Sequence, residues 1–325
     1  MTTWKDTLQA ARFFTGFLPS FTSIGYLTRR TFWRPDRRDF SGQHWLVTGA
    51  STGIGREIAY QAATAGARVT AVARSEVRLQ TLAKQCSGLT GRIVPVVRDL
   101  SLTASTRSLL ETLSTEPPMD VLVNNVGVLL TTPACTAEGL DTGFATNLLN
   151  PWLLTKQAAT RGLLGRNATI INMSSGGMYN VPLSIASLES HANYQGALAY
   201  AHHKRAQVAL TAYQRRTELG DRRHYVMHPG WVDTPGVETS LPDFHRVLKP
   251  LLRNVAAGAD TALWLAAERP AQPSPDGIWF DRSLRPVHVL PGTREGADID
   301  SLLAYLDTRS ADALLTEGAR EAAFA

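Results

Sequence analysis

The sequence predicts an α/β fold in which helices cover both faces of a doubly wound parallel sheet of about seven strands. Near-continuous apolar runs, typical of strands buried on both faces, alternate along the chain with helix-prone stretches. A glycine-rich stretch follows the first apolar run and opens the first helix, as in sheets that bind phosphate groups at a strand-to-helix turn.

The expected elements follow this alternation. The strands are expected at residues 43–48, 67–73, 92–97, 119–125, 168–173, 224–228 and 277–280. The helices before the fourth strand are expected at residues 55–66, 75–85 and 103–114. The first of these helices should end at Gly66, since glycine readily adopts the backbone conformation that closes a helix.

Length and charge divide the chain into a central domain with two extensions. The 325 residues suit one domain of about 250 residues plus extensions, which we place at 41–292. Residues 1–40 form an amphipathic, basic extension with seven Lys and Arg against three Asp. Residues 293–325 form an acidic, helical extension, in which residues 294–325 carry three Arg against seven Asp and Glu.

Composition excludes several classes of function. A net charge of +5 is too small to indicate a nucleic-acid partner, and no zinc spacing or helix-turn-helix pattern occurs. The two cysteines, Cys86 and Cys135, form neither a disulfide framework nor a metal site, which favours a reducing, cytoplasmic location. No apolar run is long enough to span a membrane.

The aromatic stretch at residues 13–19 leaves two interpretations open. It either covers the body of the fold or lies on a membrane surface or a subunit partner. Because the whole extension is basic, we regard peripheral contact with an anionic membrane through residues 1–40 as the sharper hypothesis.

The turn between the first strand and the first helix is predicted to bind a dinucleotide. Gly49 permits a tight turn, Gly53 lets the backbone approach a pyrophosphate, and Gly55 lets the helix pack closely on the sheet. The helix N-terminus then offers free N–H groups and a positive dipole. The expected cofactor-binding residues of this turn are Gly49, Ser51, Thr52, Gly53, Ile54 and Gly55.

Tyr200 and Lys204 are candidates for proton transfer. Four residues apart, they share one face of a helix. A neighbouring ammonium favours the phenolate and is expected to lower the pKa of the tyrosine toward working pH. Tyr194 and Tyr213 have no lysine four residues later. Adjacent histidines on a helix point in different directions, so His202 and His203 are expected to pack or face solvent rather than bind a metal.

Taken together, these motifs resemble the short-chain dehydrogenase/reductase family over about residues 42–290. Val126 stands where the family usually has alanine. Within the family, residues 174–178, 204–208, 227–237 and 258–266 are similar to the branch called member 12. The matching residues are Thr48, Gly49, Gly53, Ile54, Gly55, Asn124, Asn125, Gly127, Asn147, Ser175, Tyr200, Lys204, Pro229 and Gly230.

The resemblance implies a Rossmann-fold oxidoreductase that interconverts a carbonyl and an alcohol with NAD(P). It implies that Tyr200 is the general acid/base. It also implies that Lys204 lowers the pKa of Tyr200 and binds the nicotinamide ribose. It implies that Ser175 donates a hydrogen bond to the substrate carbonyl, with Ser174 as the alternative. It also implies that Asn147 binds a water molecule of the proton relay. It also implies a homo-oligomer formed through the helices beside the catalytic helix.

The cofactor is expected to be NADP(H) rather than NAD(H). Where family members that prefer NAD carry an acid, this chain has Ala73 followed by Arg74, and an arginine can bind a 2′-phosphate in a bidentate manner. The resemblance adds further cofactor-binding residues, with Tyr200 and Lys204 also among them. They are Asp99, Leu100, Asn125, Gly127, Pro229, Gly230, Val232 and Thr234.

The long segment near residues 179–198 departs from compact family members. Ser175 and Tyr200 lie 25 residues apart, so the intervening chain must form a loop beside the site. Its apolar residues predict a lipophilic substrate, such as a retinoid-, steroid- or lipid-like carbonyl, or alternatively a subunit contact. A second class of function is a non-catalytic NADP(H)-binding sensor or scaffold. The intact Tyr200 argues against that class, since a binder does not need it.

Overall fold

The computed structural model describes residues 16–35, 37–189, 191 and 193–324, with side chains described as far as residue 313. Its centre is an eight-stranded sheet of order β3-β2-β1-β4-β5-β6-β7-β8. Every neighbouring pair is parallel except β7 with β8. The strands are β1 (His44–Thr48), β2 (Arg68–Ala73), β3 (Arg92–Val97), β4 (Met119–Asn124), β5 (Leu164–Met173), β6 (Arg223–Met227), β7 (Ile278–Phe280) and β8 (Ser283–Arg285).

The predicted parallel α/β sheet is confirmed, and two details differ. Strand β5 begins four residues earlier than expected, at Leu164. Strand β8 is an eighth strand that the sequence did not indicate. Its three residues are too few for a periodic pattern, and it forms by folding back antiparallel onto β7.

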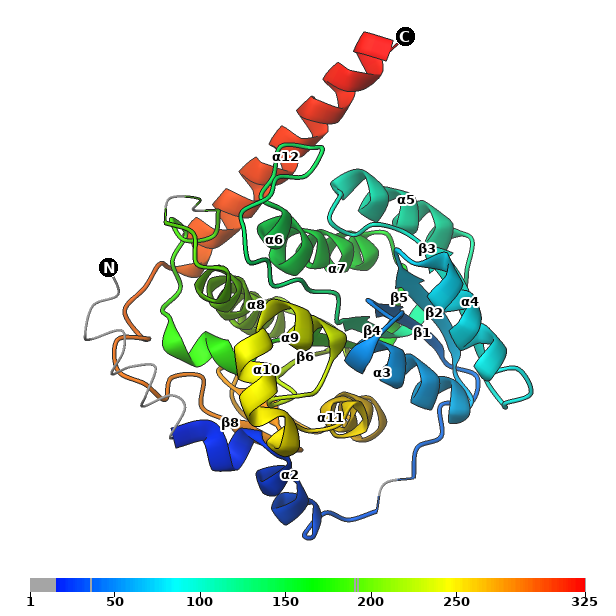
Figure 1. Ribbon diagram of the computed structural model, residues 1–325. Coiled ribbons are helices and arrows are strands. Elements are labelled where there is room, and N and C mark those ends of the chain that lie inside the picture. Colours follow the sequence, from blue (N-terminus) through cyan, green and yellow to red (C-terminus); the bar gives the residue numbers. More distant parts are fainter. Residues whose placement is uncertain (1–15, 36, 190, 192, 325) are drawn as a thin grey trace.

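Helices cover both faces of the sheet (Figure 1). Helices α3, α4 and α11 contribute to the core on one face, and α5 and α7 to the core on the other. The helices are α2 (Ser23–Arg30), α3 (Gly53–Thr64), α4 (Glu76–Gln85), α5 (Thr103–Ser114), α6 (Thr142–Phe144), α7 (Asn150–Thr160), α8 (Gly196–Thr217), α9 (Pro235–Ser240), α10 (Pro242–Leu248), α11 (Val255–Glu268) and α12 (Ile299–Phe324).

The core follows from the alternation of side chains along each strand. On β1, Trp45 and Val47 pack into the cluster that contains Ile58 of α3. The intervening Leu46 belongs to the opposite cluster, with Leu109 of α5. Burial of both faces explains why the strands read as continuous apolar runs rather than as alternating ones.

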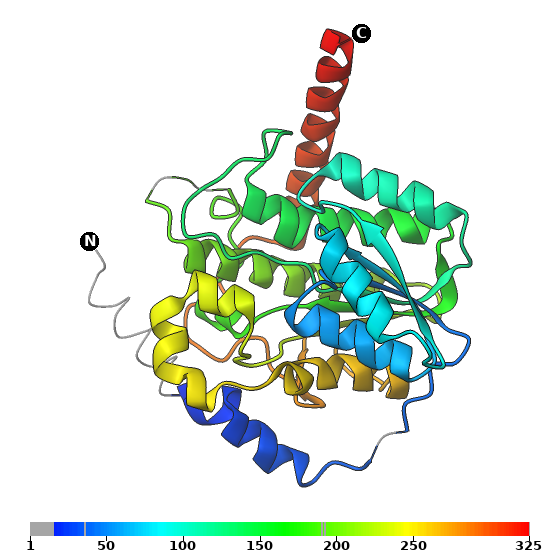
Figure 2. The same ribbon diagram turned by 45° about the vertical axis from the view of Figure 1, so that its right-hand side comes forward.

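The described part of the N-terminal extension packs on the body of the fold. The ring of Phe21 lies 4.6 Å from that of Phe17 and 5.2 Å from that of Phe280. Helix α2 then runs beneath α10 and α11 (Figures 1 and 2). Phe17 and Phe21 thus cover part of the body, whereas contact of the extension with a membrane or a subunit stays a prediction. Phe13 and Phe14, which belong to the same aromatic stretch, lie outside the described residues.

The C-terminal helix α12 packs against the helices beside the sheet and then projects from the body (Figure 2). Leu302 and Leu306 of α12 join the cluster that contains Trp152 of α7 and Leu210 of α8. This face is the one that the resemblance assigned to a subunit contact, so a contact there would have to involve α12 or displace it. The oligomeric state stays a prediction.

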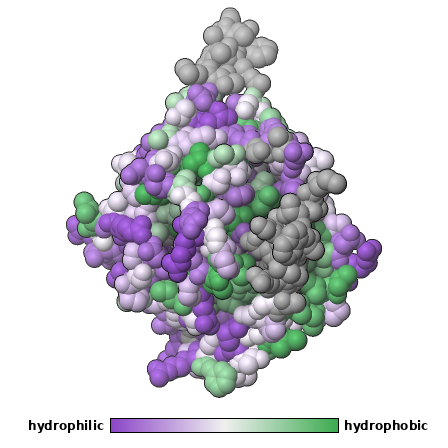
Figure 3. Space-filling model, turned by 90° about the vertical axis from the view of Figure 1, so that its left-hand side faces the viewer, coloured by the Kyte–Doolittle hydropathy of each residue, from purple (hydrophilic) through white to green (hydrophobic). Residues whose placement is uncertain are grey.

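Among the described residues, no helix combines the length and the apolar character that crossing a bilayer requires. Figure 3 shows a face on which hydrophilic and hydrophobic side chains are mixed, with the hydrophobic ones gathered mainly beside the grey segment.

Candidate active site

The glycine turn after β1 has the backbone geometry that the sequence predicts. Gly49 and Gly53 have φ angles of +68° and +56°, in the left-handed region that favours glycine. A Cβ at Gly55 would lie 2.2 Å from Nδ2 of Asn125 and 2.5 Å from the carbonyl oxygen of Gly49. Only a glycine at this position lets α3 approach the end of β4 so closely.

The N-terminus of α3 fits an anionic ligand. Thr52 is the N-cap residue, yet its side chain accepts no capping hydrogen bond, and the first turn contains no acidic residue. The first N–H groups of a helix have no acceptor within the helix. Together with the helix dipole, these groups suit the pyrophosphate of a dinucleotide.

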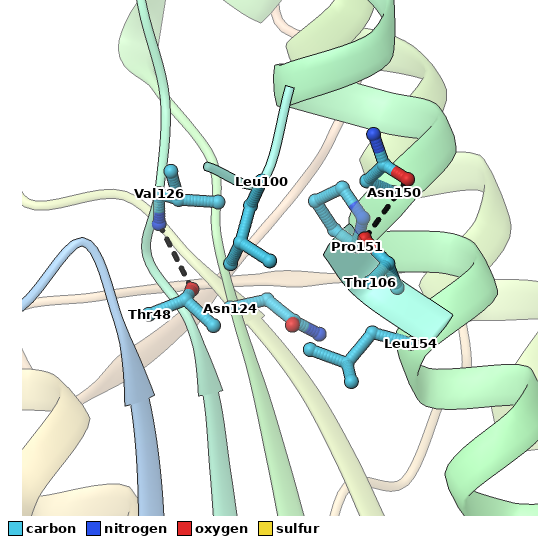
Figure 4. A pocket seen from close by; sticks show the side chains of 8 residues that line it. All are labelled: Thr48, Leu100, Thr106, Asn124, Val126, Asn150, Pro151 and Leu154. Carbon is cyan, nitrogen blue, oxygen red and sulfur yellow. Dashed lines mark hydrogen bonds between the residues drawn. The ribbon is translucent and has the colours of Figure 1, made fainter. Parts of the chain in front are cut away.

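Asn125 and Thr48 hold the turn in place. Asn125 donates from Nδ2 to the carbonyl oxygen of Thr48, at 2.9 Å. The hydroxyl of Thr48 accepts from the N–H groups of Asn125 and Val126, at 3.0 and 3.1 Å. Figure 4 shows the Thr48–Val126 bond beside a second one, between Thr106 and Asn150. The small gap between the eight residues labelled in Figure 4 is too small for a water molecule. The side chains below the turn are therefore closely packed.

Arg74 and Asp99 lie at neighbouring strand ends. Ala73, the last residue of β2, pairs with Val97, the last residue of β3. Arg74 is exposed and has no hydrogen bond or ion pair within the part of the chain that the structure describes. Asp99 accepts a bond from the N–H of Ser101, at 3.0 Å. A free guanidinium therefore stands at the edge of the sheet where β2 ends.

Tyr200 and Lys204 share one face of α8, as predicted, but the pKa of the tyrosine moves in the opposite direction. The Lys204 Nζ atom lies 5.4 Å from the centroid of the Tyr200 ring. Burial raises the pKa of Tyr200 to about 12 and lowers the pKa of Lys204 to about 7. The lysine donates to the Met173 carbonyl oxygen at 2.8 Å, so desolvation, rather than the ammonium, governs Tyr200 in this structure.

Gln207 joins this group and was not predicted. Its Oε1 accepts from Lys204 Nζ at 3.1 Å, and its Nε2 donates to the carbonyl oxygen of Asn147 at 2.8 Å. Asn147 lies in a π-helical turn, Ala145–Leu149, a distortion that is frequent at functional sites. The spacing of three residues after Lys204 puts Gln207 on the same helix face and could have revealed it.

Asn147 is held by three further bonds. Its Oδ1 accepts from the Val128 N–H at 2.7 Å, and its Nδ2 donates to the Val128 carbonyl oxygen at 2.8 Å. The same Nδ2 lies 3.2 Å from Nδ1 of His203. A Cβ at Gly127 would lie 3.2 Å from Asn147 Oδ1 and 3.5 Å from Lys204 Nζ, so the fold brings these three predicted residues together.

His203 is a buried part of this network rather than a packing or solvent-facing residue. Its Nε2 lies 2.8 Å from the carbonyl oxygen of Leu188, and burial lowers its pKa to about 4. The ring is therefore neutral at physiological pH and links the long loop to Asn147. His202 is also buried.

The two serines after β5 have different environments. Ser174 is buried and donates to the carbonyl oxygen of Lys204 at 3.0 Å. Ser175 is only partly buried, and its hydroxyl accepts from the N–H of Gly177 at 3.3 Å, which leaves its proton free to donate. A Cβ at Gly177 would lie 3.6 Å from Cβ of Ala201 and 3.8 Å from Ser175 Oγ, which places Ser175 beside the start of α8.

The loop after β6 faces the glycine turn. A Cβ at Gly53 would lie 3.4 Å from Cγ2 of Thr234, and one at Gly258 would lie 2.8 Å from Cγ2 of Val232. Gly230 has a φ angle of +77°. Arg253 donates to the Pro229 carbonyl oxygen at 3.2 Å, which ties the start of the loop to the body.

Arg253 also anchors the N-terminal extension. Its buried guanidinium donates to the carbonyl oxygens of Ser20 and Phe21, each at 2.8 Å, and to Asp281 at 2.6 and 2.9 Å. Asp281 in turn accepts from Arg29 of α2 at 2.6 Å. These long-range bonds were not predicted, because no local pattern signals a pair separated by more than 200 residues.

The segment between β5 and α8 is held by α12. After a short 3-10 helix, Gly176–Asn180, its described residues form no regular element before Gly196. Arg309 donates to both carboxylate oxygens of Glu189, at 2.6 and 3.0 Å, and the Tyr305 hydroxyl donates to the same group at 2.6 Å. The C-terminal extension therefore fixes the loop beside the site.

Comparison with known proteins agrees with this geometry. The family model described as short chain dehydrogenase matches residues 43–243. "Dehydrogenase/reductase SDR family member 12" of Bos taurus is 35% identical over 86% of this chain and 90% of its own length. "Retinol dehydrogenase 12" of Homo sapiens is 32% identical, over 80% of this chain and 84% of its own length.

A solved structure supports the same assignment. The angucycline C-6 ketoreductase LanV with bound NADP superposes with a TM-score of 0.56 at 26% identity, over 71% of this chain and 90% of its own. The match to a family model, the related sequences and the shared fold all point to one group of enzymes. The chain therefore belongs to the short-chain dehydrogenase/reductase family, NAD(P)-dependent oxidoreductases that interconvert CH–OH and C=O groups.

Proposed function

We propose that this chain reduces a lipophilic carbonyl compound with NADPH, with Tyr200 as the general acid. The observation that carries the proposal is the shared face of α8, on which Lys204 Nζ lies 5.4 Å from the centroid of the Tyr200 ring. Burial also raises the pKa of Tyr200 to about 12. The phenol stays protonated across the physiological range and can donate its proton to a carbonyl oxygen.

The neighbouring residues would orient the substrate and the cofactor. Ser175 would donate its free hydroxyl proton to the substrate oxygen, whereas the hydroxyl of Ser174 is already bonded to the backbone of α8. Lys204 would hold the nicotinamide ribose, and Asn147 would support the proton relay. Water is excluded from the inner side of this group because Lys204 and Asn147 are buried.

NADP(H) is proposed as the cofactor, and it supplies the hydride that is exchanged with the substrate carbon. The uncapped N-terminus of α3 suits its pyrophosphate, and the unpaired Arg74 suits its 2′-phosphate. The remaining residues proposed to hold it are Gly49, Ser51, Thr52, Gly53, Ile54, Gly55, Asp99, Leu100, Asn125, Gly127, Pro229, Gly230, Val232 and Thr234.

The lipophilic substrate is supported by a smaller set of side chains than the sequence indicated. Val181 and Leu188 of the long loop are buried in the core and cannot line an open pocket. Leu198 is 44% exposed and lies two residues before Tyr200. A relative named for retinol, itself a lipophilic alcohol, is consistent with such an entrance. The proposal fails if small polar aldehydes are reduced far faster than long-chain ones.

The test is an untargeted turnover assay. The purified protein is incubated with NADPH and a lipid-rich extract, and mass spectrometry records compounds that gain two hydrogens. Tyr200→Phe should lower the rate about 100- to 10,000-fold, the range that proton transfer contributes. Tyr213→Phe, later on the same helix, is the matched control and should retain activity. If NADPH binds tightly and nothing is reduced, the sensor or scaffold function replaces the proposal.

Peripheral membrane contact is proposed for the outer face of the N-terminal extension. Ile24, Leu27 and Phe32 are 55%, 56% and 84% exposed, and the exposed Arg30 and Arg34 lie beside them. Apolar side chains flanked by arginines suit an anionic bilayer surface. Replacing Ile24, Leu27 and Phe32 by aspartate should abolish co-sedimentation with phosphatidylserine vesicles while leaving turnover intact. Unchanged co-sedimentation would exclude this surface.

A further inference from the structure

A second pocket lies beside the catalytic helix α8, and neither Tyr200 nor Lys204 lines it. It has a volume of about 290 Å³ and is formed by α8, the long loop and the chain between β8 and α12. In Figure 1 this last segment, in orange, runs from β8 past α8 to α12. Arg205, Val208 and Ala212 of α8 line the pocket, at spacings of three and four residues that define one helix face.

The inner wall of this pocket contains a buried cation with neutral partners only. The Arg205 guanidinium donates to the carbonyl oxygens of Val287 and Thr293, both at 2.8 Å. It also donates to His288 Nδ1 at 2.7 Å and contacts the sulfur of Met178. Arg205 is almost fully buried, and no carboxylate pairs with it within the described residues. A buried charge without a counterion is costly, so such a site favours an anion.

The mouth of the pocket is also positive. Arg294 is exposed and has no hydrogen bond or ion pair among the described residues. Arg216 is already paired with Asp276, the one acidic side chain of the lining, at 2.5 Å. His288 accepts from Arg205, and burial together with Arg205 and Arg294 lowers its pKa, so it adds no charge at neutral pH. Three arginines against one aspartate leave an excess of two positive charges.

The rest of the lining is apolar. Leu183 of the long loop, Val208 and Ala212 of α8, Val287 and Ile299 contribute aliphatic surface. A volume near 300 Å³ is at the lower end of the range for small-molecule sites. The pocket therefore combines a positively charged end with an apolar wall, and its volume suits a ligand with one short aliphatic chain.

We propose that this pocket binds a small amphiphilic anion, with a carboxylate or phosphate group at Arg205 and Arg294 and an aliphatic tail against Leu183 and Val208. The ligand would contact both the catalytic helix and the loop, through residues other than Tyr200 and Lys204. It would thereby connect two elements that flank the active site without entering it. This site is separate from the proposed function and does not depend on it.

Binding of octanoate and octyl phosphate to the full-length chain, measured by calorimetry, tests the proposal. At least one should bind with a Kd below about 1 mM, whereas octanol and acetate should bind at least about tenfold more weakly, because each lacks one half of the ligand. The two headgroups distinguish a carboxylate from a phosphate ligand. Equal binding of octanol, or no binding by either anion, would overturn the proposal.

Variants locate the binding. Ala209→Trp places an indole into the pocket and should abolish binding, and Arg294→Gln should weaken it at least about threefold. Arg246→Gln, an exposed arginine of α10, is the matched control and should bind like the wild type. Arg205→Met should reduce binding most; if it does not fold, the two other variants decide. Unaltered binding by both Ala209→Trp and Arg294→Gln would refute the site.

Discussion

Two parts of the site are built in different ways: the glycine turn, and the segments that Arg253 and Arg309 hold in place. At the glycine turn, the functional groups are backbone atoms of one short segment, and the nearest supports, Thr48 and Asn125, come from adjacent strands. In the segments beside the site, Arg253 binds both the N-terminal extension and Asp281, and Arg309 binds Glu189 across 120 residues of sequence. A short sequence motif can specify the glycine turn, whereas the bonds of Arg253 and Arg309 form only when distant parts of the chain have folded together.

The strongest way to break the second arrangement is to remove the carboxylate of Asp281. Asp281→Asn leaves the buried guanidinium of Arg253 without its carboxylate and should lower the free energy of unfolding by about 3–5 kcal/mol. Asp307→Asn, which breaks an exposed pair with Lys156, is the control and should cost less than about 1 kcal/mol. Urea denaturation measures both. Equal effects of the two variants would show that the buried pair does not anchor the extension.

The second prediction concerns the stability cost of burying Lys204. Its pKa falls from an ordinary value of 10.5 to about 7 in the folded state. Below pH 7 Lys204 is protonated in both the folded and the unfolded chain, so burying its charge lowers the free energy of unfolding by the full amount. Between pH 7 and 10.5 the unfolded chain binds a proton that the folded chain has released, so folded stability rises with pH.

Lys204→Met has no such titration. It should therefore be more stable than the wild type at pH 7, and the difference should shrink by roughly 2–4 kcal/mol as the pH approaches 10.5. Chemical denaturation at several pH values measures the difference. A constant difference across this window would mean that Lys204 is not desolvated.

Gly55→Ala is the corresponding way to break the glycine turn. The added methyl group would overlap Nδ2 of Asn125 and the carbonyl oxygen of Gly49, which should cost about 1–3 kcal/mol of stability and weaken NADPH binding. Gly16→Ala, where no atom lies within 4 Å of the new Cβ, is the control. NADPH fluorescence and thermal unfolding report the two effects. Wild-type NADPH affinity in Gly55→Ala would contradict the close approach of α3.

The smallest expected effect sharpens the cofactor assignment. Arg74→Ala should raise the Kd for NADPH about tenfold, because a charge-assisted bond to the 2′-phosphate is lost, while the Kd for NADH stays constant. Arg78→Ala, on the following helix, serves as the control for surface charge. Parallel loss of both cofactors would assign Arg74 to the adenine rather than to the phosphate.

The sequence predicted the sheet because its strands are buried on both faces and therefore read as apolar runs. It also identified the glycine turn and the Tyr200–Lys204 pair, whose spacing is local. It did not reveal Gln207, which bonds to both Lys204 and Asn147, although its helical spacing was visible. The direction of the pKa shift at Tyr200 depends on burial by distant segments, which no local pattern reports.

The bonds of Arg253 have a consequence for synthesis on the ribosome. Phe21 and Ser20 are made before their partner Arg253, which emerges more than 200 residues later. At a translation rate of about 5–20 residues per second, the extension waits at least about ten seconds before it can dock. During that time the aromatic side chains of Phe17 and Phe21 are exposed and available to a chaperone, so this segment is among the last parts of the fold to reach its final place.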